Sequence, residues 1–374
     1  MIPFNKPYLS GKETIYISQA VASGKISGNG DFTMKCQYFF ESKYHFKKCL
    51  LTTSCTDALE MAAILISISE GDEVIVPSYT FVSSALAFVR EGARIVFADS
   101  EKNNPNIDVS KLETLITHKT KAIVVVHYAG VACDMDAVME LSRKHNLYII
   151  EDAAQAIDSY YKNRPLGSIG HLSTFSFHET KNIISGEGGM LAINDERLIP
   201  RSEIIWEKGT NRASFFRGEI NKYGWVDTGS SFLPSEVTAA FLYAQLECLD
   251  AIQAKRKAIW NTYNKGLQLL KTKGVGLPFI PDYATNNAHM FYLVLRSEEE
   301  RSVLIKYLKK VKVQAVFHYL SLHKSDYYLK KNQSELPQSD LYTKHLLRLP
   351  FYYELSKEDQ ESIIVHILNF FNNE

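Results

Sequence analysis

Short apolar runs rich in valine and isoleucine alternate with helix-like segments through much of the chain. These runs cover residues 73–77, 94–98, 122–127 and 147–150. Strands that alternate with helices favour a mainly parallel sheet that is covered by helices on both faces. Ligands bind at the carboxyl ends of the strands of such a sheet. Polar residues that directly follow each run are therefore the first candidates for a functional site.

An acid and a lysine follow two of the expected strands. Asp152 comes just after the run 147–150, and Lys181 lies between the aromatic run 175–178 and the glycine-rich bend 186–189. Taken singly, Asp152 suits a helix N-cap and Lys181 a hairpin turn at the surface. A lysine that attacks a carbonyl needs a partly desolvated site, which lowers the pKa of its amine. The pair favours pyridoxal phosphate, which Lys181 would hold covalently while Asp152 keeps the ring nitrogen protonated.

The segment from residue 49 to 68 predicts a strand followed by a helix, entered through Ser54, Cys55 and Thr56. The free N–H groups and hydroxyls of a helix's first turn suit phosphate binding. Capping of the helix by Ser54 or Thr56 is the ordinary alternative, because both residue types are common N-caps. The bend 186–189 is not a P-loop, since it lacks the lysine and the strand–helix context of that motif.

Four motifs resemble the DegT/DnrJ/StrS family of pyridoxal-phosphate enzymes. They are Glu151–Gln155, Phe175–His178, Lys181–Asn182 and Gly186–Gly189, and the likeness extends from Ile2–Asn5 to Leu349–Tyr352. The resemblance implies an α/β chain with the aspartate aminotransferase (type I) fold, in which a large, mainly parallel sheet of the seven-stranded type precedes a smaller α+β domain. We expect the large cofactor-binding domain over 1–240 and the smaller domain over 241–374. A long helix from about 235 to 270 would link them.

The resemblance also assigns residues to the cofactor. Phe81 would stack on the pyridine ring, Gln155 would hydrogen-bond the ring hydroxyl, and Thr56 and Ser176 would hold the phosphate. At Ser231 relatives usually have asparagine, in a loop that reaches the partner subunit. Without the resemblance, Phe81 would be interpreted as core. Lys181 and Asp152 form the implied catalytic pair, and the implied cofactor-binding residues are Cys55, Thr56, Phe81, Asp152, Gln155, Ser176, Lys181 and Ser231.

The implied reaction transfers an amino group to a nucleotide-linked keto sugar. Motifs at 207–212 and 215–218 resemble those of members that convert dTDP-4-keto-6-deoxy-D-glucose to dTDP-4-amino-4,6-dideoxy-D-galactose, with L-glutamate as amino donor. The alternatives are the gluco epimer or another nucleotide-linked keto sugar. A pyridoxal-phosphate dehydratase would lack Lys181, and a non-catalytic sensor would not need the full set of cofactor residues. The implied substrate-binding residues are His178, Arg212, Arg217, His318, Tyr319 and His323.

Composition argues against several other classes of partner. Lys plus Arg and Asp plus Glu number 42 each, so the net charge is zero and no global field favours nucleic acid or an anionic membrane. The five cysteines are scattered without CxxC spacing, which argues against a disulfide framework and a metal site and for a reducing cytoplasm. Neither a signal peptide nor a membrane span is apparent. We expect a cytoplasmic protein, and the resemblance implies a homodimer with active sites shared between subunits.

Overall fold

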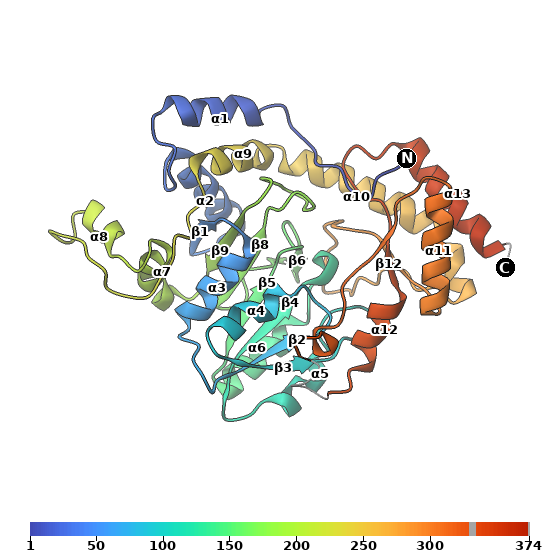
Figure 1. Cartoon of the computed structure of the whole chain (residues 1–374), viewed down its shortest axis with the longest axis horizontal. Coiled ribbons are helices and arrows are strands. Elements are labelled where there is room, and N and C mark those ends of the chain that lie inside the picture. Colours follow the sequence, from blue (N-terminus) through green and yellow to red (C-terminus); the bar gives the residue numbers. More distant parts are fainter. Residues whose placement is uncertain (329–333, 373–374) are drawn as a thin grey trace.

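The computed structural model describes residues 1–328 and 334–372, and its central element is a seven-stranded sheet with the order β1-β9-β8-β5-β4-β2-β3 (Figure 1). Neighbouring strands are parallel except that β9 is antiparallel to both β1 and β8. The predicted α/β fold with a large, mainly parallel sheet is therefore confirmed. The strands are β1 (Lys48–Thr52), β2 (Glu73–Pro77), β3 (Arg94–Ala98), β4 (Thr120–Val126), β5 (Tyr148–Asp152), β8 (Leu172–Ser176) and β9 (Gly189–Ile193).

Successive side chains of the buried strands pack into two different cores, because a strand points its residues alternately to opposite faces. On β5, Ile149 packs on the side of α2, α6 and α9, whereas Ile150 packs on the side of α3, α4 and α7. The same alternation continues to the end of the strand, so Glu151 and Asp152 point to opposite faces. These helices are α2 (Asp31–Tyr44), α3 (Cys55–Leu65), α4 (Ser83–Arg90), α6 (Met135–His145), α7 (Ile199–Trp206) and α9 (Glu236–Leu246).

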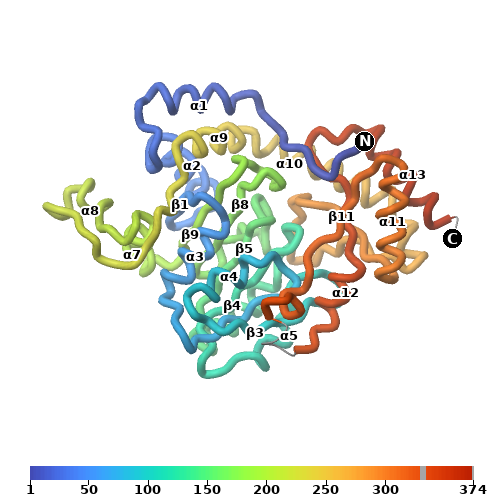
Figure 2. The backbone as a smooth tube through the Cα atoms, viewed as in Figure 1, coloured from blue at the N-terminus to red at the C-terminus, as the bar shows by residue number. Residues whose placement is uncertain are grey.

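The single long helix expected from about 235 to 270 is two helices, α9 and α10 (Leu249–Gly266), so that prediction was wrong in detail. The N–H of Cys248 donates to the carbonyl of Gln245, three residues back, at 3.0 Å. A bond of this kind tightens the chain to a 3₁₀ turn and interrupts the four-residue ladder of an α-helix. The two helices still run from the large sheet to the C-terminal part of the molecule (Figure 2).

Glu236, in the first turn of α9, fixes a helix that the sequence pattern did not predict. Its buried carboxylate accepts hydrogen bonds from the N–H groups of Gly30, Phe32 and Thr33 at 2.8–3.1 Å. These donors stand at the start of α2, where backbone N–H groups lack intrahelical acceptors. The carboxylate thus caps a helix about 200 residues away in sequence and joins α2 to α9 over one face of the sheet.

The C-terminal part has its own three-stranded antiparallel sheet, in the order β10-β12-β11, and its own apolar core. Ile2 pairs with Val313, so the first residues of the chain lie against this part and not beside the large sheet (Figure 2). The domain division at residue 240 stays a prediction. The elements here are β10 (Tyr292–Val294), α11 (Glu298–Lys310), β11 (Val316–Phe317), α12 (Pro337–His345), β12 (Leu346–Arg348) and α13 (Lys357–Asn372).

A short arm that carries α8 (Arg212–Phe216) extends away from the rest of the molecule, at the left of Figure 1. Two of its aromatic side chains are largely exposed, Phe216 at 69% and Trp225 at 84%. Over residues 1–328 and 334–372, no helix is both long enough and apolar enough to cross a membrane.

Candidate active site

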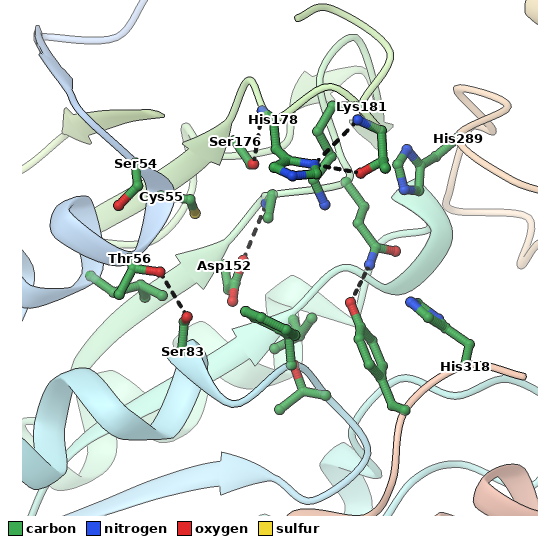
Figure 3. A pocket seen from close by; sticks show the side chains of 18 of the residues that line it. Ser54, Cys55, Thr56, Ser83, Asp152, Ser176, His178, Lys181, His289 and His318 are labelled. Atoms are coloured by element: carbon green, nitrogen blue, oxygen red, sulfur yellow. Dashed lines mark hydrogen bonds between the residues drawn. The ribbon is translucent and has the colours of Figure 1, made fainter. Parts of the chain in front are cut away.

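A cavity of about 620 Å³ opens where β5 and β8 end (Figure 3). It lies at the carboxyl edge of the large sheet, as the sequence pattern predicted. Residues of the C-terminal part form its opposite wall. Ten of the predicted site residues line it, namely Cys55, Thr56, Phe81, Asp152, Gln155, Ser176, His178, Lys181, His318 and Tyr319.

Lys181 stands in the turn between β8 and β9 and is half-buried in the cavity wall. Its backbone N–H donates to the carbonyl of His178 at 2.9 Å, which tightens the turn. Burial lowers the pKa of the Lys181 amine, and the positive charge of Arg348 lowers it further, although Asp152 opposes both effects. An amine with a lowered pKa has more of its neutral, nucleophilic form near pH 7.

Asp152 ends β5 on the same face as α4. Its carboxylate accepts a hydrogen bond from the Ser84 hydroxyl at 2.6 Å and one from the backbone N–H of Ala154 at 3.2 Å. Burial raises the pKa of Asp152, while these two donors and the charge of Lys181 act in the opposite direction. An acid held in place by neutral donors keeps an oxygen available for a cationic partner in the cavity.

The first turn of α3 forms part of the cavity wall, which also includes Ser176. The Ser54 side chain accepts from the N–H of Asp57 at 3.1 Å and is therefore the N-cap of this helix. Thr56 does not cap the helix, because its hydroxyl bonds instead to that of Ser83 at 2.7 Å. The N–H groups at the start of a helix have no intrahelical acceptor, so this turn offers donors to an anion.

Gly189, the first residue of β9, lets α3 approach the sheet this closely. A Cβ atom on Gly189 would lie 2.3 Å from the carbonyl carbon of Ser54 and 2.4 Å from the N of Cys55. Real side chains do not tolerate such distances to backbone atoms, so any other residue would push the first turn of α3 away. Gly189 thus sets the position of the first turn of α3, although it does not itself line the cavity.

Asn182, the neighbour of Lys181, joins the lysine turn to the C-terminal part. Its side-chain N–H groups donate to Gln253 Oε1 at 2.8 Å and to the carbonyl of Asn287 at 2.9 Å. Its Oδ1 is therefore the acceptor from His289 Nδ1, at 2.9 Å. Burial, together with the charges of Lys181 and Arg348, holds the pKa of His289 well below its ordinary value. His289 is thus a neutral imidazole whose proton lies on Nδ1, leaving Nε2 as an acceptor.

The other residues of the C-terminal wall hold one another in place. His318 Nδ1 bonds to the Tyr128 hydroxyl at 2.7 Å, and its ring stacks on that of Tyr319 with 3.6 Å between centroids. The Tyr319 hydroxyl accepts from Gln155 Nε2 at 3.0 Å, and Gln155 Oε1 accepts from the N–H of Ala129 at 2.6 Å. Burial lowers the pKa of His318 well below its ordinary value, so this wall is largely uncharged except for Arg348.

His178 lines the cavity but its ring is engaged locally. Its Nδ1 accepts from the N–H of Thr180 at 3.3 Å and lies 3.0 Å from that residue's hydroxyl, so Nε2 is the ring nitrogen that carries a proton. Nε2 is 3.7 Å from Glu187 Oε1. This arrangement fits the ordinary interpretation of a histidine that is satisfied at the end of a strand.

Four predicted residues lie outside the cavity of this chain. Arg212 and Arg217 are on the α8 arm, where Arg217 pairs with Glu203 at 2.8 Å and Glu219 at 2.7 Å. His323 is buried against Ser78, with 2.7 Å between Nδ1 and the hydroxyl. The exposed Ser231 forms an isolated β-bridge with Glu207. Roles for these four at the cavity of the same chain have no support in the geometry.

Known proteins share this architecture and much of the sequence. The DegT/DnrJ/EryC1/StrS aminotransferase family model matches residues 7–368. The chain belongs to this family. It is 33% identical over 373 residues to the spore coat polysaccharide biosynthesis protein SpsC of Bacillus subtilis, covering 97% of this chain and 95% of SpsC. It is also 33% identical over 378 residues to the GDP-perosamine synthase of Escherichia coli O157:H7, covering 100% and 99% of the two chains.

A solved structure agrees with the sequence matches. The PMP form of the Streptococcus pneumoniae protein Spr1654 superposes with a TM-score of 0.92 at 25% identity and covers 100% of both chains. A PLP form of Spr1654 superposes with a TM-score of 0.90, also at 25% identity, and covers 100% of this chain and 99% of that one. The predicted membership of the family and the predicted aminotransferase fold are therefore both confirmed.

The aminotransferase also has cavity residues that the sequence analysis missed. Ser84 supports Asp152, and His289 and Arg348 reach the cavity from the C-terminal part. No motif surrounds His289. Arg348 carries a signal that could have been used, because it is a single charge inside the apolar run 346–349, and a charge in such a run needs a partner or a ligand.

Glu151 supports the site from the opposite face of β5. Its buried carboxylate accepts from the N–H groups of Gly167, Ile169 and Gly170 at 2.5–2.8 Å and from His127 Nε2 at 2.9 Å. Although burial raises the pKa of Glu151, the contact with His127 and these backbone donors together lower it below the ordinary value. The carboxylate therefore fixes the segment that leads into β8 against the strand that ends in Asp152.

We expect Glu151→Gln to destabilise the aminotransferase by about 2–4 kcal/mol at pH 7, because an amide cannot accept all of these hydrogen bonds. A depressed pKa in the folded state adds stability above the unfolded pKa of about 4.3, and this stability is lost as pH falls through the folded value. Urea unfolding at pH 7 and pH 3.5 is then expected to show a smaller gap between wild type and variant at the lower pH.

The control for this prediction is Glu113→Gln. Glu113 is exposed and pairs with Lys144 and His145 at the surface, so its loss is expected to leave the urea midpoint nearly unchanged. Equal destabilisation by the two substitutions, or a gap for Glu151→Gln that does not change with pH, contradicts the role given to the buried carboxylate.

Proposed function

We propose that this aminotransferase converts dTDP-4-keto-6-deoxy-D-glucose to dTDP-4-amino-4,6-dideoxy-D-galactose, with L-glutamate as the amino donor. The observation that carries the proposal is the placement of Lys181, Asp152 and the first turn of α3 around one cavity, with the pKa of the lysine lowered. A relative bears the name GDP-perosamine synthase, which is that of an enzyme whose product is a nucleotide-linked sugar. This name supports the class of the substrate.

The predicted cofactor, pyridoxal 5′-phosphate, is confirmed by membership of the family and by the PLP and PMP forms of Spr1654. When bound, it supplies a carbonyl that exchanges with amines and a ring that accepts the electron pair released at the neighbouring carbon. The cavity fits this group, because the first turn of α3, the acid at the end of β5 and the lysine all line it (Figure 3). The first turn of α3, which packs against Gly189, gives the phosphate a preformed set of donors.

We assign the individual roles from this arrangement. The N–H groups of Cys55 and Thr56 and the Ser176 hydroxyl hold the phosphate. Asp152 holds a proton on the ring nitrogen, since its carboxylate is oriented by Ser84 and Ala154. Phe81, which lines the cavity and is 55% exposed, lies against one face of the ring. An apolar face packs on the ring without competing for its electrons.

Lys181 acts both before and after the amine is exchanged. Its neutral amine would hold the cofactor through the carbonyl, and once displaced it would move a proton between the two carbons that flank the transferred nitrogen. The neutral His289 stands beside it, with Nε2 free of a proton. Exclusion of water limits exchange of the transferred proton with solvent. The stacked rings of His318 and Tyr319 form part of the wall on the C-terminal side.

The face of the sugar that Lys181 meets decides the product. The amine is galacto when it is axial at C4 and gluco when it is equatorial, and the chemistry at the lysine is the same for both. A difference of a few kcal/mol in how the cavity holds the hexose selects one epimer. The motifs at 207–212 and 215–218 favour galacto, although both lie on the α8 arm outside the cavity of the same chain.

Incubation of the purified enzyme with pyridoxal phosphate, dTDP-4-keto-6-deoxy-D-glucose and L-glutamate tests this proposal. We expect an amino sugar whose proton NMR spectrum has a small H3–H4 coupling, which indicates an axial amine. A large coupling would assign the gluco epimer and correct only the product. Lys181→Ala is the control and is expected to lose turnover by several orders of magnitude, because groups that act as a unit are not replaced by their neighbours. Full activity of this variant would contradict the proposed mechanism.

We also propose a homodimer in which the Ser231 loop of one subunit reaches the cofactor phosphate in the other. Ser231 is exposed and does not line the cavity of its own chain, and the exposed Phe216 and Trp225 lie on the neighbouring arm. Exposed aromatic side chains grouped on a projecting segment are typical of surfaces that bind another protein. A second copy of this chain is the partner that would complete the phosphate site.

Mixing two inactive variants tests the shared site. Ser231→Glu places a negative charge against the phosphate and is expected to abolish activity, as is Lys181→Ala. Hybrid dimers contain one intact site, so random exchange of subunits restores about a quarter of wild-type activity if sites are shared. Full activity of Ser231→Glu alone, or no recovery on mixing chains that exchange, contradicts a shared site.

A further inference from the structure

His289 lines the cavity with one ring nitrogen engaged and the other without a partner. Its Nδ1 donates to Asn182 Oδ1 at 2.9 Å, so the proton of the neutral ring lies on this nitrogen. Its Nε2 bonds to no group of residues 1–328 and 334–372. A ring nitrogen in this state has a lone pair that accepts a hydrogen bond. The cavity therefore contains an uncharged acceptor whose donor has to be found.

The turn that carries His289 is fixed in a conformation that residues other than glycine rarely adopt. The buried Ala288 has a φ of 53°. The N–H of His289 donates to Asn287 Oδ1 at 3.1 Å, and Asn287 Nδ2 donates to the carbonyls of Gln155 and Ile157, both at 2.8 Å. Strained backbone of this kind persists only where its surroundings hold it, and it gathers at functional sites. The fold thus presents this imidazole to the cavity in one fixed position.

Three cations surround His289, and only one of them is a candidate donor to Nε2. Arg256 uses Nε on the carbonyl of Ala288 at 3.1 Å and Nη2 on that of His289 at 2.6 Å. Arg348 Nε has no acceptor within residues 1–328 and 334–372, so it does not donate to the ring. Lys181 acts on the pKa of His289 more strongly than either arginine, second only to burial. Because Coulomb energy falls with distance, this order favours Lys181 as the nearest cation.

Asn182 joins the lysine and the imidazole into one unit. It directly follows Lys181 in the chain, and its Oδ1 is the acceptor for the His289 ring. Figure 3 shows Lys181 and His289 at the same end of the cavity, away from Thr56. The Lys181 Nζ bonds to no group of the described residues, so an unpartnered donor and an unpartnered acceptor line the same cavity.

We propose that His289 is a positioning residue for Lys181, and that the amine of Lys181, once displaced from the cofactor, donates a hydrogen bond to His289 Nε2. The inference rests on the role proposed for Lys181. The displaced amine takes a proton from one carbon and carries it as an ammonium until the proton reaches the second carbon. An ammonium out of bulk water needs an acceptor. Asp152 is engaged by Ser84 and by the ring nitrogen in the proposed arrangement.

A neutral imidazole suits this task because it accepts a hydrogen bond without taking the proton. Burial and the neighbouring charges hold the pKa of His289 well below its ordinary value, so the proton stays on the Lys181 Nζ. His289 neither gains nor loses a proton during the transfer. Its contribution is to orient Nζ between the two carbons, and its loss is expected to slow the proton transfer more than it weakens substrate binding.

Two substitutions separate the free acceptor from the rest of the ring. His289→Asn keeps an N–H near the position of Nδ1 for Asn182 but removes the acceptor at Nε2. His289→Gln has a longer side chain and keeps an oxygen near the position of Nε2. We expect the Asn variant to lose the effect on Lys181 and the Gln variant to restore much of it. A residue that only supports the fold gives no reason for this order.

NMR of the full-length enzyme loaded with pyridoxamine phosphate tests the hydrogen bond directly, because the amine of Lys181 is free in this form. With ¹⁵N-labelled histidine, we expect the His289 proton on Nδ1. With lysine labelled at ¹³Cε, the Lys181 signal is identified by its absence in Lys181→Ala and followed against pH. In His289→Asn the pKa of this amine is expected to fall by about one pH unit, since a hydrogen bond that favours the charged form is lost.

Steady-state and isotope measurements on the same variants test the consequence for the reaction. In His289→Asn we expect turnover to fall about 10- to 100-fold, while the half-saturating concentrations of L-glutamate and keto sugar change less than about threefold. The rate difference between ordinary glutamate and glutamate deuterated at its α-carbon is expected to increase, because proton removal becomes slower. His289→Gln is expected to fall between this variant and wild type.

The matched control is His171→Gln. The half-buried His171 also has a lowered pKa, owing to burial, and its Nδ1 accepts from the N–H of Ile149 at 3.0 Å, but it lies outside the cavity. This substitution is expected to leave the titration of Lys181 and the turnover unchanged. An equal effect of His171→Gln assigns the result to a general loss of structure and overturns the inference.

The remaining outcomes distinguish this inference from the function on which it rests. A His289 proton on Nε2, an unchanged Lys181 titration in His289→Asn, or a rise in half-saturating substrate concentration with turnover intact each overturns the inference and leaves the aminotransferase standing. A wild-type enzyme that transfers an amino group to no nucleotide-linked keto sugar overturns the proposed function. The titration of Lys181 then still decides whether His289 binds its amine.

Discussion

The desolvation of charged groups at one edge of the large sheet is the constraint on which the site depends. Lys181, Asp152 and Arg348 line one cavity. Burial shifts the pKa of each in the direction that favours the neutral form of the side chain. For the lysine this shift produces a nucleophile. For the acid it is balanced by fixed donors, and for the arginine it remains uncompensated within the described chain. One physical effect therefore yields three different chemical roles.

The fold maintains these conditions with residues that do not line the cavity. Successive residues of β5 point to opposite faces, so Glu151 binds the backbone leading to β8 while Asp152 faces α4. Asn182 connects the lysine turn to the C-terminal part and fixes the tautomer of His289. Gly189 lets α3 approach within van der Waals contact. Each of these groups positions a neighbour that meets the ligand, which is how a rigid site is built from a flexible chain.

The site residues that directly follow a predicted strand in the sequence were the ones that could be predicted. Asp152 and Lys181 follow apolar runs whose period and length indicate strands, and local pattern carries that information. Arg348 and His289 belong to the same cavity but come from the C-terminal part, over 100 residues later, where only Arg348 lies on a strand of the smaller sheet. Their place depends on how two parts of the molecule pack, which no local pattern encodes. For the same reason α2 was missed, since Glu236 caps it from a distant segment.

The most direct test of this account is the identity of the lysine that carries the cofactor. Purified holoenzyme is reduced with borohydride, digested, and its peptides are mapped by mass spectrometry. The account predicts a reduced pyridoxyl group on Lys181, because burial beside Arg348 gives this amine its lowered pKa. A group on any other lysine, or no covalent attachment in protein that has bound the cofactor, would contradict it.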